Sequence, residues 1–207
     1  MLFGITGSIG SGKSYVCRRI ASIGFPVYDC DTQARRLMTD DTRLVEAVKR
    51  LVGEDAYVGG QLNKPVVARY LFGDADHAAR LNALVHPAVR RDFVRWAQAQ
   101  HADHAFVESA ILFEAEFDKL LDRVVCVTAP LAVRIERVME RDHCDEAAVH
   151  QRMERQMDDF DLCRRSDYIL LNDGQHDIDL QLRNILSDNT TSPIPSNNLK
   201  THKLKNS

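Results

Sequence analysis

The chain has 207 residues, 44% of them hydrophobic, and a formal net charge of −3. This length suits one domain of ordinary size, and the slightly acidic balance excludes the broad basic surface typical of nucleic-acid-binding proteins. No stretch approaches the roughly 20 apolar residues of a membrane-spanning helix, and no signal peptide is evident, so we expect a cytoplasmic protein without membrane or nucleic-acid partners.

Five short apolar runs predict the strands of a parallel sheet, because continuous apolarity is typical of strands covered on both faces. A helical pattern from Lys13 to Ile23 follows the first run and ends at Gly24, with Pro26 just beyond. Strand, helix and strand therefore predict a parallel crossover. The runs are Leu2–Thr6, Phe25–Tyr28, Ala105–Val107, Val124–Thr128 and Tyr168–Leu171.

The segment GITGSIGSGKSYV, residues 4–16, lies between the first predicted strand and helix. It satisfies the phosphate-loop pattern G-x-x-x-x-G-K-[S/T] in the strand–helix context that makes this pattern meaningful. Such a loop surrounds phosphates with backbone N–H groups, its lysine reaches the outer phosphates, and its hydroxyl binds Mg²⁺. We expect Ser14 to bind that metal and the nucleotide to contact Gly7, Ile9, Gly10, Ser11, Gly12, Lys13, Ser14 and Tyr15.

The second predicted strand ends in VYDCD, which places Asp29 and Asp31 at the same sheet edge as Lys13. Asp31 is suited to take the proton of a hydroxyl that attacks a phosphate. It is equally suited to cap the helix that TQARRLM predicts, or to do both. A GTPase is disfavoured, because NKPV at residues 63–66 lacks the expected aspartate and no D-x-x-G occurs.

Residues from about 32 to 101 contain several helical patterns and no convincing strand, which predicts a long helical insertion. In the stretch ARLNALVHPAVRRDFVRWAQAQ, Pro87 suits the first turn of a helix.

A later helix is predicted to begin near Pro130, to break at residues 142–145 and then to resume, as in a mobile lid. Its arginines are spaced by three and four residues, so they share one face. Either this face is solvated and partly neutralised by neighbouring glutamates, or it neutralises charge during phosphoryl transfer. The arginines are Arg134, Arg137 and Arg141; Arg152 and Gln156 in the following helix are weaker candidates.

The remaining features predict no further site. The cysteines are scattered and show no metal-ligand spacing, which predicts buried, reduced thiols and no transition-metal site. From about Asp188 the chain is rich in Ser, Thr, Asn, Pro and Lys, so we expect a disordered tail. The cysteines are Cys17, Cys30, Cys126, Cys144 and Cys163.

Seven segments in one order and spacing resemble the dephospho-CoA kinases over about residues 2–175. These segments are GITGSIGSGKS, VYDCD, LNALVHP, ILFE, RVMERD, RMERQM and SDYILLNDG. The resemblance implies an α/β P-loop kinase with about five parallel strands flanked by helices, which transfers the γ-phosphate of ATP to the 3′-hydroxyl of dephospho-CoA. It implies a core of residues 1–31 and 102–187, an acceptor-binding insertion of about 32–101 and a lid of about 138–157.

The same resemblance implies roles for individual residues. Asp31 matches the catalytic carboxylate. Arg137 and Arg141 match the lid arginines, and together with Asp31 and Lys13 they form the expected catalytic set. Asn172 matches the region beside the adenine of ATP. The motifs that line the acceptor side match His86, Pro87, Phe113 and Glu114.

Three residues depart from the family pattern: Glu108 stands where Asp is frequent, Arg134 replaces a frequent Gln, and Ser166 replaces a frequent Ala. We expect activity to survive these changes and the protein to be a monomer or weak oligomer. The alternatives are another small-molecule or nucleotide kinase, and a nucleotide-binding regulatory module without phosphotransfer.

Overall fold

The structure is a computed structural model that describes residues 1–74 and 76–187. The chain divides into two compact units, one of residues 1–28 with the chain from 100 onward, the other of residues 29–99. The predicted tail from Asp188 lies outside the described residues.

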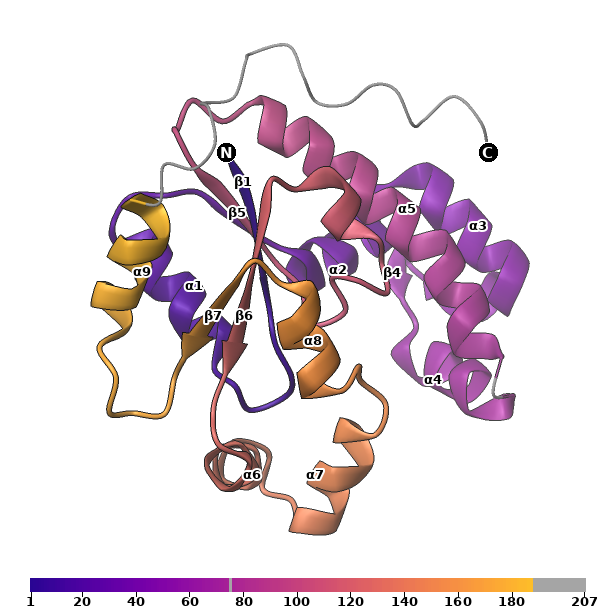
Figure 1. Cartoon of the computed structure of the whole chain (residues 1–207). Helices are drawn as coiled ribbons and strands as arrows, with labels where there is room; N and C mark the ends of the chain where they lie inside the picture. Colours follow the sequence, from indigo (N-terminus) through magenta and orange to yellow (C-terminus); the bar gives the residue numbers. More distant parts are fainter. Residues whose placement is uncertain (75, 188–207) are drawn as a thin grey trace. The chain divides into compact units, whose positions relative to one another are not determined.

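The first unit is built on a five-stranded parallel sheet with the order β2-β5-β1-β6-β7, as Figure 1 shows. All five predicted strands are present; the first and last have the predicted bounds, and the second begins two residues late. The strands are β1 (Leu2–Thr6), β2 (Val27–Asp29), β5 (Ala105–Glu108), β6 (Arg123–Thr128) and β7 (Tyr168–Leu171).

Five α-helices of the described residues belong to this unit, and α1 and α9 lie side by side against the sheet (Figure 1). The predicted break after residue 142 is present, because His143 adopts a left-handed conformation (φ 51°) and Asp145 caps the next helix. The helices are α1 (Lys13–Ser22), α6 (Leu131–Asp142), α7 (Glu146–Met153), α8 (Asp159–Arg165) and α9 (Ile178–Ser187). A 3₁₀ turn, η2, spans Phe117–Leu120.

Both faces of β1 are covered. Phe3 and Ile5 belong to the buried core that also contains side chains of α1 and α9. On the other face, a Cβ added to Gly4 would lie 2.5 Å from a methyl carbon of Leu112 and of Leu121. This double burial explains why the strands read as continuous apolar runs.

The parallel register brings the carboxyl ends of the strands to one edge. Ile5 pairs with Glu108, and Thr6 pairs with Cys126. The segments that leave β1, β5, β6 and β7 therefore start from the same edge, where ligands of parallel sheets bind.

The second unit consists mainly of helices packed on the longest of them, α5, which contacts α2, α3 and α4. Leu37, Val48, Val85 and Phe93 are buried in it. Its elements are α2 (Cys30–Asp40), α3 (Thr42–Val52), η1 (Glu54–Ala56), β3 (Tyr57–Val58), β4 (Gln61–Leu62), α4 (Lys64–Gly73) and α5 (His77–Gln98).

Two expectations for this unit are wrong. The two-residue strands β3 and β4 form an antiparallel pair where no strand was expected, because strands this short carry no periodicity. Pro87 lies inside α5 rather than in a first turn. The helix continues through the proline because Val85, Ala88 and Val89 around it are buried, and this packing offsets the missing hydrogen bond.

The cysteines are all reduced, as predicted. Cys17, Cys30 and Cys126 are buried, whereas Cys144 and Cys163 are only half-buried. The Sγ atoms of Cys126 and Cys163 lie 3.5 Å apart, at hydrogen-bond distance.

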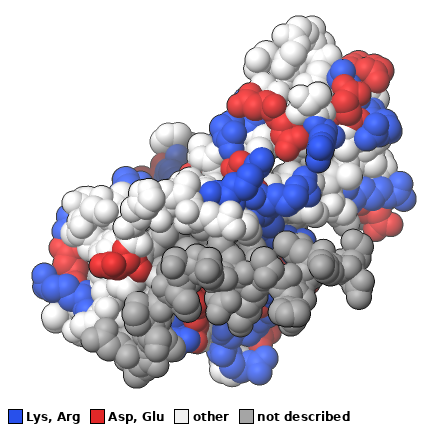
Figure 2. All heavy atoms as spheres, turned by 90° about the horizontal axis from the view of Figure 1, so that it is seen from above, with Lys and Arg blue, Asp and Glu red and all other residues white. Residues whose placement is uncertain are grey.

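Charges of both signs lie next to one another on the face shown in Figure 2. One pair of opposite charges is that of Lys49 with Glu46 on α3, at 3.2 Å. Within residues 1–74 and 76–187, no helix has the length and apolarity needed to cross a bilayer.

Candidate active site

The phosphate loop connects β1 to α1, and two of its glycines are required by close contacts. Gly10 (φ 80°) lies so close to α6 that an added Cβ would be 2.5 Å from the carbonyl oxygen of Arg134. At Gly12 (φ 91°), an added Cβ would be 2.1 Å from Nδ2 of Asn172. The loop is therefore held in its curled form by neighbours on both sides.

Lys13 begins α1 and turns back over the loop. Its Nζ donates to the carbonyl oxygens of Gly7 at 2.7 Å and Ser8 at 3.3 Å. The ammonium group thus lies on the loop's own backbone, beside the N–H groups at the start of the helix, whose partial positive charge attracts anions.

Ser14 and Glu108 bring a hydroxyl and a carboxylate together at the sheet edge. The Ser14 hydroxyl donates to Oε1 of Glu108 at 2.7 Å. Oxygen donors of this kind suit Mg²⁺, which takes part of its coordination from substrate phosphates. The described residues contain no group of three or more His, Cys, Asp or Glu that could hold a metal.

The three arginines of α6 do not share one environment. Arg134 is 5% exposed and pairs with Asp159, so the interpretation as a solvated face is wrong for this residue. Arg137 donates to the carbonyl oxygens of Asn172 at 3.0 Å and Gly10 at 3.5 Å. Of the three, it is the one whose side chain reaches the phosphate loop.

Arg141 lies at the end of α6 in an exposed cluster. Its Nε and Nη2 donate to Asp142 at 2.8 and 2.9 Å, and Arg152 donates to the same carboxylate. These hydrogen bonds, that of Arg141 first, lower the pKa of Asp142 to about 2.

Two polar side chains from the segment after α7 also hold the phosphate loop. The Ile9 N–H donates to Oε1 of Gln156 at 2.8 Å, and the Ser8 hydroxyl donates to Asp159. Gln156 was a weak candidate in the sequence. Asp159 was not found, because no local pattern links it to a loop about 150 residues earlier.

A cleft of 640 Å³ adjoins the end of the phosphate loop. Tyr15 and Arg19 from α1, Arg137 from α6 and the turn after β7 line it. Asn172 also lines the cleft; it is buried, and its Nδ2 donates to the carbonyl oxygen of Ser11 at 2.8 Å. Asn172 therefore supports the loop directly.

Asp173 orders the turn after β7. It accepts hydrogen bonds from the N–H groups of His176 at 3.0 Å and Gln175 at 2.9 Å. The same N–H groups, that of His176 first, lower the pKa of Asp173 to about 2. One wall of the cleft is thus a turn fixed by an ionised carboxylate.

Two residues that the resemblance assigns to the acceptor side lie in the first unit. Phe113 is 6% exposed, and the guanidinium carbon of Arg165 lies 4.2 Å from its ring centroid. Glu114, next to it, is exposed. In this structure Phe113 is part of the packed interior and Glu114 is the accessible member of the pair.

Asp31 and His86 lie in the second unit, in the first turn of α2 and within α5. Helix α2 is capped by Asp29, whose Oδ1 accepts the N–H groups of Asp31 at 3.0 Å and Thr32 at 3.2 Å. The capping role considered for Asp31 therefore belongs to Asp29. Asp31 itself is exposed.

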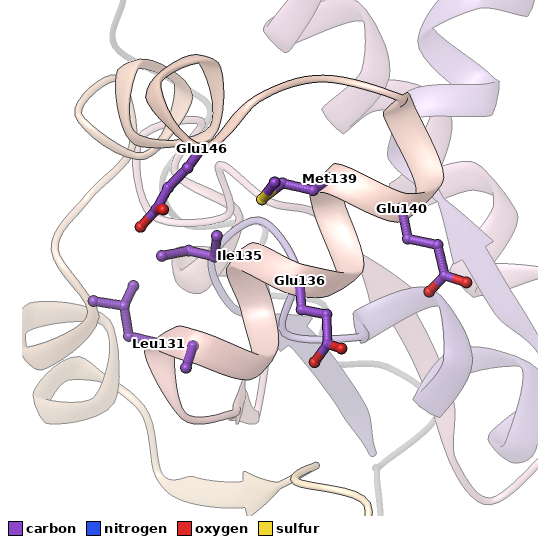
Figure 3. A pocket seen from close by; sticks show the side chains of 7 residues that line it. Leu131, Ile135, Glu136, Met139, Glu140 and Glu146 are labelled. Carbon is purple, nitrogen blue, oxygen red and sulfur yellow. The ribbon is translucent and has the colours of Figure 1, made fainter.

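A second hollow, of 760 Å³, lies between α6 and α7. Figure 3 shows Leu131, Ile135 and Met139 along one side of α6, with Glu146 reaching over from α7. The lining is completed by Ala132, Glu136 and Glu140. Carboxylates repel phosphates, so this hollow does not suit a nucleotide.

Comparisons with known proteins agree with this geometry. The family model for dephospho-CoA kinase matches residues 1–177. A dephospho-CoA kinase of Bacteroides fragilis is 37% identical over 185 residues, covering 89% of this chain and 90% of the relative. One of Porphyromonas gingivalis is 36% identical, covering 95% and 98% of the two chains.

Solved structures show the same fold. A crystal structure from Thermus thermophilus has a TM-score of 0.79 at 35% identity and covers 92% of this chain and 98% of its own. A shikimate kinase of Bacteroides thetaiotaomicron has a TM-score of 0.52 at 14% identity, covers 89% and 95% of the two chains, and supports the fold alone. The phosphate loop, the parallel sheet and the match over most of the sequence together show that the chain belongs to the dephospho-CoA kinase family.

Proposed function

We propose that this chain transfers the γ-phosphate of ATP to the 3′-hydroxyl of dephospho-CoA, giving coenzyme A and ADP. The observation that carries the proposal is the phosphate loop, with Lys13 and the Ser14–Glu108 pair at one sheet edge, in a chain that the family model matches over residues 1–177. Loop, lysine and hydroxyl are the parts that phosphoryl transfer from ATP requires.

The phosphate loop binds the nucleotide's phosphates in this proposal. Its N–H groups and the start of α1 face the phosphate oxygens, and Lys13 exchanges the Gly7 and Ser8 carbonyls for phosphate. Ser14 and Glu108 hold Mg²⁺, which neutralises charge on the phosphates. The residues assigned to nucleotide binding are Gly7, Ile9, Gly10, Ser11, Gly12, Lys13, Ser14, Tyr15 and Asn172.

The 640 Å³ cleft beside the loop takes the adenine base. Tyr15 and Arg137 line it and offer a ring and a guanidinium plane on which a base can stack. Asn172 supports this site indirectly, because its side-chain amide donates a hydrogen bond to the loop at Ser11. The base thus extends from the loop toward the turn after β7.

Asp31 accepts the proton of the attacking hydroxyl. It is exposed, and Asp29 already satisfies the first N–H groups of α2, so the Asp31 carboxylate is available for chemistry. Asp31 belongs to the second unit, so its placement against the phosphate loop is part of the proposal. His86, Phe113 and Glu114 belong to the acceptor side.

Arg137 and Arg141 neutralise charge that develops during transfer. Arg137 already reaches the loop, whereas Arg141 must exchange Asp142 for phosphate. We assign residues 138–157 to a lid, 32–101 to the acceptor-binding insertion and the rest up to 187 to the core.

An acceptor panel tests the proposal. The purified chain, with Mg²⁺ and saturating ATP, is given dephospho-CoA, adenosine, AMP or pantetheine phosphate, and ADP formation and the phosphorylated product are measured. We expect rapid ADP formation only with dephospho-CoA. Turnover with another acceptor alone would assign a different small-molecule kinase, and nucleotide binding without transfer to any acceptor would favour a regulatory module.

A further inference from the structure

An ion pair between a buried arginine and a partly exposed aspartate lies against the phosphate loop. The guanidinium of Arg134, on α6, donates to both carboxylate oxygens of Asp159 at the start of α8. Oδ1 of Asp159 also accepts the hydroxyl of Ser8. One carboxylate is thus shared between a buried arginine and the loop.

The same region of the loop is held by two further contacts. The Ile9 N–H donates to Gln156 at 2.8 Å, and Gly10 packs against the backbone of Arg134. Helix α6 and the segment from residue 156 to α8 therefore fix three consecutive loop residues, Ser8, Ile9 and Gly10.

Arg134 is a costly residue for a purely structural role. Its Nε is buried and has no hydrogen-bond partner among the described residues. A buried charge with an unsatisfied N–H adds little to stability compared with an apolar side chain of similar size. Its positive charge is the property that an apolar residue cannot supply.

The charge of Asp159 acts in the same place as that of Lys13. Burial raises the pKa of the Cys126 thiol, Asp159 raises it further, and Lys13 lowers it. The geometry agrees: Nζ of Lys13 donates to the carbonyl oxygen of Ser8, and Asp159 accepts the hydroxyl of the same residue, so both charges contact Ser8. A carboxylate that contacts the phosphate loop repels phosphates there unless a cation cancels its charge.

We propose that Arg134 is a positioning residue for ATP: it holds Asp159 against Ser8 and neutralises it, so that Asp159 orders the phosphate loop without repelling the nucleotide. This inference rests on the proposed ATP site. It assigns to Arg134 and Asp159 a joint role in nucleotide affinity, with neither residue in contact with the phosphates.

The two charges predict opposite effects on ATP affinity. Arg134→Gln leaves Asp159 uncompensated, so the Kd for ATP rises by about tenfold. Asp159→Asn removes the repulsive charge and keeps an oxygen for the Ser8 hydroxyl, so the Kd stays at the wild-type value or falls. Both variants lower the melting temperature, because each removes one partner of an ion pair whose arginine is buried.

Two further variants separate charge from shape. The double variant Arg134→Gln with Asp159→Asn is neutral at both positions, so its Kd returns to within about threefold of wild type. Arg134→Lys keeps the positive charge and loses the two-pronged contact, so it retains ATP affinity while its melting temperature falls. A variant that fails to fold leaves the other three to decide.

Calorimetric titration of the full-length variants with ATP and Mg²⁺, without acceptor, measures the effect. The control is Asp122→Ala, which removes an acceptor for the Leu2 N–H (2.7 Å) at the opposite sheet edge and lowers stability without changing the Kd. A rise in Kd for both Arg134→Gln and Asp159→Asn, or no change for Arg134→Gln, would overturn the proposal. Because no acceptor is used, a wrong assignment of dephospho-CoA as the acceptor would not change this result. If the wild-type chain does not bind ATP, both the proposed function and the proposed role of Arg134 are wrong.

Discussion

The start of α2 contains two aspartates with different surroundings. Asp29 is engaged through both oxygens: Oδ1 accepts the N–H groups of Asp31 and Thr32, and Oδ2 accepts the Thr32 hydroxyl at 2.6 Å. Asp31 is exposed in the first helical turn, where the helix dipole favours its negative charge. A substitution at Asp31 therefore tests chemistry without removing the cap.

Asp31→Asn keeps the size of the side chain and removes its ability to accept a proton. If Asp31 is the base, kcat falls by about 10²-fold or more, while ATP affinity and melting temperature stay near wild type. Coenzyme A formation at saturating ATP is the measurement.

The matched control is Asp29→Ala, which removes the cap. We expect it to cost about 1 kcal/mol of unfolding free energy, seen as a lower melting temperature. Robust coenzyme A formation by the Asp31→Asn enzyme would exclude Asp31 as the base.

The candidate site was predictable where its residues are contiguous and not where they are distant. The loop from Gly7 to Ser14 is readable because one short segment contains the whole pattern. The pair of Arg134 with Asp159 is not, since its partners are on different helices and the arginine looks like part of a charged surface stripe. Only tertiary packing shows that its side chain is 5% exposed.

The arginines of helix α6 lie in different surroundings along the length of the helix. Arg137 contacts the loop at Gly10, and Arg141 pairs with Asp142. If both serve phosphoryl transfer, replacing either with Ala lowers kcat by more than its effect on stability explains.

Steady-state kinetics and thermal unfolding of Arg137→Ala and Arg141→Ala test this expectation. Arg164→Ala is a suitable control, because Arg164 is exposed and makes a comparable surface pair with Asp161 at 3.3 Å. If the kinetics of both α6 variants are unaltered, Arg137 and Arg141 have no role in phosphoryl transfer.

Elements were predictable in proportion to their length and burial. The five sheet strands are continuous apolar runs because both sheet faces are covered. Helix α8, with seven residues and four charges in DFDLCRR, shows too little apolar periodicity to be found. It nevertheless provides Asp159, so a short helix without a sequence signal carries a loop contact.

At the scale of the whole molecule, α9 is the last helix of the described residues. Leu182 and Ile185 are buried in the main core. The sequence after Ser187 is poor in large apolar residues, and this composition predicts too little apolar burial to offset the entropy of ordering. Truncation after Ser187 should therefore preserve both activity and melting temperature.

Truncation after Asp177, which also removes α9, is the contrasting variant. Each buried side chain of α9 contributes about 1.5–3 kcal/mol to the free energy of unfolding. The chain without α9 should therefore unfold at a much lower temperature. Assays of both truncations with ATP and dephospho-CoA complete the comparison. Loss of acceptor affinity after removal of residues 188–207 alone would show that the tail has a role in catalysis.

The hydrogen bonds of Lys13 to Gly7 and Ser8 set a threshold for ligands. A ligand that replaces the Gly7 and Ser8 carbonyls at the Lys13 ammonium group must interact with that group more strongly than these carbonyls do. A multiply charged phosphate meets this condition. A nucleoside without phosphate has nothing to exchange. We therefore expect the loop to discriminate between ligands by their charge, independently of contacts with a base or sugar.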